Sequence, residues 1–183
     1  MNTLSLGVVL FVGVHLVPAI PPIKRALVKR VGFNAYRGLF SLVALAGLLA
    51  MIFGKASAGF VHVYAPPSWG RHLALTVMPF ASILLTAAYL PGHLRRWVRH
   101  PMLLGVAAWA TCHLFANGDQ ASLLLFGGML AFALLDLGSH LFREAAAPRP
   151  AHAWADAVAV LVGGGSYVAT LYLHGMLFGP PIW

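Results

Sequence analysis

The sequence predicts an all-α integral membrane protein with about six transmembrane helices joined by short loops. Of its 183 residues, 60% are hydrophobic and only 9% are charged, whereas a soluble domain typically has about a quarter of its residues charged. The apolar residues come in runs of roughly 16 to 20, which is the length of a bilayer-spanning helix. The basic residues fall in the short segments between these runs. Together these observations define a polytopic helical bundle.

Each apolar run is assigned to one span. The predicted spans cover about residues 3–20, 38–54, 72–91, 101–116, 121–141 and 158–178. The first run lacks a basic start and a small-residue cleavage site, so we interpret it as a span and not as a cleaved signal. Because no repeat or linker interrupts the pattern, we predict a single transmembrane domain over residues 1–183.

The basic residues predict the orientation. Ten of the twelve lie in the loops after the first, third and fifth spans: Lys24, Arg25, Lys29, Arg30, Arg37, Arg95, Arg96, Arg99, Arg143 and Arg149. Lys55 and Arg71 lie in the loop after the second span. Since cytoplasmic loops are enriched in Lys and Arg, we expect a cytoplasmic (inner) membrane protein with both termini in the periplasm. The net charge of +8 then faces anionic lipid and is not a nucleic-acid-binding surface.

Two of the nine histidines occupy unusual positions. His15 and His113 each lie about twelve residues into a predicted span, some 18 Å from its start. The other seven lie in loops or near span ends, where water satisfies them: His62, His72, His93, His100, His140, His152 and His174. A deep imidazole either forms a hydrogen bond across helices or binds a metal, and two of them could ligate a ring-shaped cofactor from both sides. The residues alone leave both alternatives open.

The stretch around the second histidine carries a resemblance. Residues 99–119 read RHPMLLGVAAWATCHLFANGD, which resembles the signature of the NnrU family of membrane proteins. That family is associated with denitrification and nitric oxide metabolism, and the resemblance extends over essentially the whole chain. It implies a role in the expression or maturation of nitrite and nitric oxide reductases.

The stretch around His15 carries a second resemblance. It reads VGVHLVPAIPPIKRALVKRVGFNAYRGLF and is similar to the start of zeta-carotene isomerases, which are relatives of NnrU. In those enzymes two histidines bind haem b, one in such a first-span phrase and one in a Trp-x-x-x-His phrase. The resemblance therefore implies that His15 and His113 are the axial ligands of a haem b iron. It also implies that Trp109 and His100 lie at the cofactor.

The zeta-carotene isomerases have a cysteine that this chain lacks at the corresponding position. They have it directly after the tryptophan, where this chain has Ala110. Cys112 lies beside His113 but about 100° around the helix. We interpret it as a small buried apolar residue.

Whether the protein is an enzyme stays open. The alternative to the NnrU function is a haem-dependent cis–trans isomerase of a lipophilic polyene such as a carotenoid. The isomerase would bind a lipophilic substrate, whereas the NnrU function would involve nitric oxide. The Arg99-His100-Pro101 phrase is also similar to membrane S-adenosylmethionine-dependent methyltransferases, but their downstream glutamate pair is missing, since Glu144 is the only glutamate after Arg99. The sequence does not define an oligomeric state.

Two acidic residues are assigned structural roles. Asp136 is the only acid well inside a span, and we expect it to pair with His140, four residues on, or with Arg37. Asp119 follows the Asn117-Gly118 turn and is expected to cap the next helix.

Overall fold

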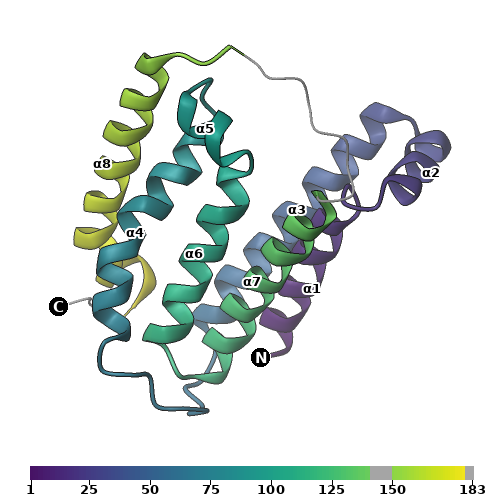
Figure 1. Ribbon diagram of the computed structural model, residues 1–183. Coiled ribbons are helices and arrows are strands. Elements are labelled where there is room, and N and C mark those ends of the chain that lie inside the picture. The colour runs from purple at the N-terminus through teal and green to yellow at the C-terminus, as the bar shows by residue number, and fades with distance from the viewer. Residues whose placement is uncertain (141–149, 180–183) are drawn as a thin grey trace. The chain divides into compact units, whose positions relative to one another are not determined.

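The computed structural model describes residues 1–140 and 150–179, which fold into helices joined by short segments (Figure 1). The helices are α1 (Asn2–Leu16), α2 (Pro21–Val31), α3 (Phe33–Ala56), α4 (Gly70–Ala87), α5 (His93–Val98), α6 (Pro101–Ala116), α7 (Gln120–His140) and α8 (Ala153–Phe178). In this described part there is no strand, only one isolated antiparallel bridge between His62 and Asp119. The all-helical prediction is confirmed.

The helices form two compact units, and the first contains α1, α2, α3 and α7. In it, α1 packs mainly against α3 and also against α7 (Figure 1). Glycines bring the backbones of α1 and α3 into contact: a Cβ added at Gly47 would lie 2.7 Å from the Phe11 nitrogen, and one at Gly54 would lie 2.5 Å from the Leu4 nitrogen. These pairings show that α1 and α3 are antiparallel.

The second unit contains α4, α5, α6 and α8. Here α4 packs against both α6 and α8. A Cβ added at Gly163 of α8 would lie 2.6 Å from the Ile83 Cα of α4. Further along, the Tyr167 hydroxyl donates to the Leu75 carbonyl oxygen at 2.8 Å. These two pairings show that α4 and α8 are antiparallel.

The membrane character is confirmed by length and composition. Among the residues that the structure describes, four helices, α3, α4, α7 and α8, are long and apolar enough to cross a membrane, or five if the bent pair α1 and α2 forms one span. The apolar helix α6 has 16 residues. The count of six spans stays a prediction.

Several predicted boundaries were wrong. The first span was expected to reach residue 20, but α1 ends at Leu16. The segment 24–37, expected to be a loop, contains α2 and the start of α3, because Pro21 begins a helix and Gly32, at φ 82°, separates it from the next. A further short helix, α5, lies in the predicted loop before Pro101. These helices were missed because hydropathy identifies apolar runs and not basic amphipathic helices. Arg143 and Arg149 lie outside the described residues.

The orientation predicted from the basic residues can be tested with a reporter that is active only in the periplasm. Fused after Trp183 it should be active, and inserted at Gly32, between α2 and α3, it should be silent. The physical reason is that the cationic segments are retained on the cytoplasmic side. The opposite pattern at both positions would contradict the predicted topology.

Candidate functional site

His15 lies in the last turn of α1, within an apolar and aromatic surrounding. Its Nδ1–H donates to the Phe11 carbonyl oxygen one turn earlier, at 2.7 Å. The ring centroid lies 4.1 Å from that of Phe11, 5.1 Å from that of Phe40 and 5.6 Å from that of Phe132. Residues from α1, α3 and α7 thus surround the imidazole. Because a carbonyl oxygen only accepts, Nδ1 carries a proton, and in the neutral ring Nε2 has the lone pair.

His113 has the same arrangement in the second unit. It lies in the last turn of α6, and its Nδ1–H donates to the Trp109 carbonyl oxygen at 2.8 Å. The Trp109 and His113 ring centroids are 5.3 Å apart. Trp109 therefore both fixes the tautomer of His113 through its carbonyl and packs against the imidazole with its indole. As in His15, Nε2 carries the lone pair.

These hydrogen bonds fit a ligand role. Histidines that bind metals usually donate the other ring N–H to a carbonyl or carboxylate, which orients the ring and makes the ligating nitrogen more basic. Among the described residues, no group of three or more His, Cys, Asp and Glu side chains could hold a metal ion by itself. A haem iron needs only one or two protein ligands, since the macrocycle supplies the others. Each of these imidazoles therefore fits the role of an axial ligand to a haem iron.

His100, which was also predicted to lie at the cofactor, is far from His113. His100 is the residue that precedes α6, and at about 1.5 Å per residue it lies roughly 20 Å from His113 along the axis. His174 of α8, in contrast, lies close enough to His113 for a charge on one ring to affect the other. The sequence predicted only that His174 lies near the end of a span, where water satisfies it. Their proximity could have been predicted, because His113 and His174 both lie near the ends of helices that run in the same direction.

Cys112 and Asp136 have the structural surroundings that the sequence predicted. Cys112 is only 2% exposed. Asp136 Oδ1 lies 3.9 Å from His140 Nε2 and accepts a hydrogen bond from the Ser139 hydroxyl at 3.0 Å. The predicted Asp136–His140 pair is present. The Arg37 guanidinium, the other expected partner, lies 5.6 Å from the centroid of the Phe33 ring.

A polar cluster at the start of α7 was only partly anticipated. Asp119 caps the helix as predicted, with the Ser122 N–H donating to its Oδ1 at 2.9 Å. Lys55, at the end of α3, donates to the same carboxylate at 2.9 Å and to the Ser122 hydroxyl at 2.7 Å. The sequence assigned Lys55 only to a loop. Its partner lies 64 residues away in the chain, beyond the reach of local patterns.

A loop segment is held against the same cluster by backbone hydrogen bonds. The Val63 N–H donates to the Gly118 carbonyl oxygen at 2.9 Å, and the Gln120 N–H donates to the Val61 carbonyl oxygen at 2.9 Å. These bonds connect the segment after α3 to the turn before α7. The cluster therefore stabilises the fold of the first unit at this end.

Asp119→Asn should destabilise the protein by about 1–3 kcal/mol, because it removes the charge that Lys55 requires. Burial raises the pKa of the Asp119 carboxyl, but hydrogen bonds from Ser122 and Lys55 and the Lys55 charge outweigh it, and the pKa lies below its usual value. The carboxylate therefore stabilises the fold above the unfolded-state pKa of about 4. This stability is lost as pH falls through the folded pKa. Thermal unfolding in detergent should show an acid-dependent loss in the native protein that Asp119→Asn lacks.

Asp156 holds the short helix α5 in the second unit. Its Oδ2 accepts hydrogen bonds from the His93 N–H at 3.0 Å and from His93 Nδ1 at 2.8 Å, and its Oδ1 accepts from the Leu94 N–H at 2.9 Å. A Cβ added at Gly92 would collide with this carboxylate. No local pattern predicts this contact, which joins residues 63 positions apart.

The fold defines a class: a helical membrane protein, here with two part-buried imidazoles whose Nδ1 atoms are held by backbone carbonyl oxygens. Residues 3–182 match the family model described as NnrU protein. The chain belongs to the NnrU family, which confirms the first resemblance found in the sequence. A comparison with curated proteins found no match, and neither did a comparison with solved structures.

Proposed function

We propose that this NnrU-family protein is a haem b protein of the bacterial cytoplasmic membrane that acts in denitrification and nitric oxide metabolism. The observation that supports it best is the pair of hydrogen bonds from His15 Nδ1 and His113 Nδ1 to backbone carbonyl oxygens. Both leave Nε2 as the ligating nitrogen. Family membership supports the physiological context.

Each part of the chain has a defined task in this proposal. The Phe11 and Trp109 carbonyl oxygens hold the protons on Nδ1 and so keep each imidazole in the ligating tautomer. Phe40 and Phe132 form an apolar wall at His15 that excludes water. When bound, haem would supply a redox-active iron able to bind small ligands such as nitric oxide.

The test of haem binding is an absorption spectrum of detergent-purified protein from haem-replete cells, recorded oxidised and reduced. A low-spin spectrum with sharp bands on reduction, at one haem per chain, supports two imidazoles on one iron. Protein that folds and binds no haem would contradict the proposal and leave two hydrogen-bonded core histidines.

The physiological role is tested separately in a deletion strain of a denitrifying host. Nitrite and nitric oxide reductase activities should fall, while the carotenoid isomers of the membrane stay unchanged. Altered carotenoid isomers with normal reductase activities would favour the isomerase alternative.

A further inference from the structure

Helix α2 is basic and lies entirely on the surface of its unit. None of its residues is buried. It carries four cations, Lys24, Arg25, Lys29 and Arg30, and the sequence contains no Asp or Glu before Asp119. None of the three ion pairs among the described residues involves α2. These cations are therefore available to an external anion.

The apolar residues of α2 are also exposed. Ile23, Leu27 and Val31 recur every fourth residue, and they are 45%, 37% and 45% exposed. A helix of 11 residues is marginal in water without apolar packing. This exposed edge is stabilised if it enters the hydrocarbon boundary of a bilayer while the cations stay among the headgroups.

The direction of α2 agrees with that placement. Its axis is bent by 92° from that of α1, and Figure 1 shows α2 turning away at the end of α1. If α1 runs along the membrane normal, α2 lies parallel to the membrane plane. The basic residues predict that this plane is the cytoplasmic surface, whose lipids are anionic.

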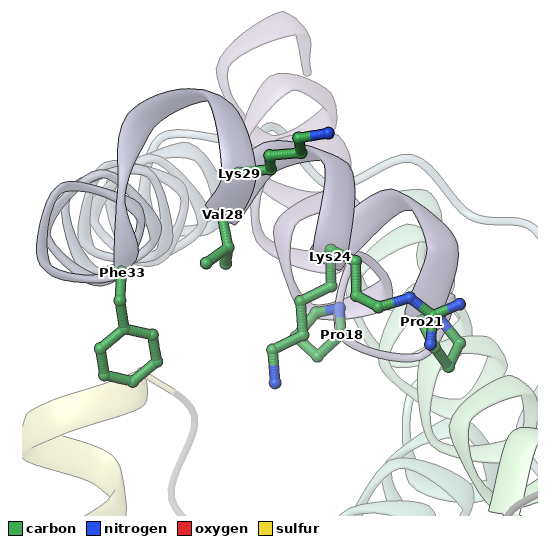
Figure 2. Close-up of a pocket in the computed structure, with 7 residues that line it drawn as sticks. Pro18, Pro21, Lys24, Val28, Lys29 and Phe33 are labelled. Atoms are coloured by element: carbon green, nitrogen blue, oxygen red, sulfur yellow. The ribbon is translucent and has the colours of Figure 1, made fainter.

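A pocket of about 510 Å³ opens beside α2, between the turn that follows α1 and the first residue of α3. It is lined by Pro18, Pro21, Lys24, Arg25, Val28, Lys29 and Phe33. Figure 2 shows Lys24, Val28 and Phe33 extending to the same side of the helices. Cationic and apolar groups thus share one concavity, which matches an anionic headgroup attached to hydrocarbon.

We propose that α2 lies in the cytoplasmic interface and that this pocket binds the phosphate of an anionic phospholipid. Lys24, Arg25 and Lys29 supply the donors to the phosphate oxygens. Val28 and Phe33 contact the glycerol and the first acyl carbons. The protein thereby selects its lipid neighbour at the end of the helix that carries His15.

The in-plane position is tested with nitroxide labels placed singly at residues 22–31 in a Cys112→Ala background, in lipid nanodiscs. Labels at 23, 27 and 31 should be most accessible to oxygen, which concentrates in lipid. Labels at 25 and 29 should be most accessible to a water-soluble nickel complex. Uniform access to the nickel complex along α2 would overturn the proposal.

Lipid selectivity is tested on full-length protein in nanodiscs of equal phosphatidylglycerol and phosphatidylcholine, by native mass spectrometry of retained lipid. The native protein should retain phosphatidylglycerol, and the triple variant K24Q/R25Q/K29Q should retain several-fold less. The matched control R95Q/R96Q/R99Q, which loses the same charge near α5, should retain as much as the native protein. Equal losses in both triple variants, or displacement of the lipid by inorganic phosphate, would overturn the proposal.

Discussion

His113→Ala should convert a low-spin haem b into a high-spin, weakly held one, because an axial imidazole is lost. His15→Ala should have the same effect, and the double variant should contain almost no haem. The measurement is the absorption spectrum of purified protein, oxidised and reduced, together with haem content per chain. His113→Gly gives a sharper version, since added imidazole should restore the low-spin spectrum when the only defect is the missing ligand.

Two other histidines serve as controls for this experiment. His100 precedes α6 at the end opposite His113, so His100→Ala should keep the low-spin spectrum. His174 lies close enough to His113 for a charge on one ring to affect the other, and His174→Ala should shift the spectrum slightly without a change of spin state. A high-spin product from His100→Ala or His174→Ala, with a normal spectrum from His15→Ala, would show that His15 is not the second ligand.

Gly47→Ala should destabilise the first unit by about 1–3 kcal/mol, the usual effect of forcing extra volume into a packed contact. The added Cβ would lie 2.7 Å from the Phe11 nitrogen and 3.1 Å from the Gly7 carbonyl oxygen. Both are backbone atoms, so relief requires α1 and α3 to separate. The measurement is the thermal unfolding midpoint in detergent.

Gly38 provides the matched control on the same helix. Nothing lies within 4 Å of a Cβ added there, so Gly38→Ala should be neutral or slightly stabilising through the better helix propensity of alanine. Equal midpoints for Gly47→Ala and Gly38→Ala would contradict the close α1–α3 contact. Since Phe11 also accepts the His15 hydrogen bond, Gly47→Ala is expected to weaken haem retention as well.

The sequence by itself determined the class of the protein. In lipid, the backbone N–H and C=O groups of a long apolar segment form their hydrogen bonds within a helix. The all-helical membrane character therefore followed from composition and periodicity. Helix α6 matched its predicted range of 101–116, because proline at its first position and the polar turn at Asn117 mark both ends. The phrase around His113, residues 99–119, identified the NnrU family.

The tertiary structure decided what those residues contact. The Lys55–Asp119 and His93–Asp156 pairs join residues more than sixty positions apart, and no local pattern encodes such distances. Helix α2 was not predicted from the sequence for a different reason: its mixture of cations and apolar residues forms no apolar run. The Nδ1-protonated tautomer of each histidine also depended on the folded backbone, because only a formed helix brings the carbonyl four residues earlier within 2.7–2.8 Å of Nδ1.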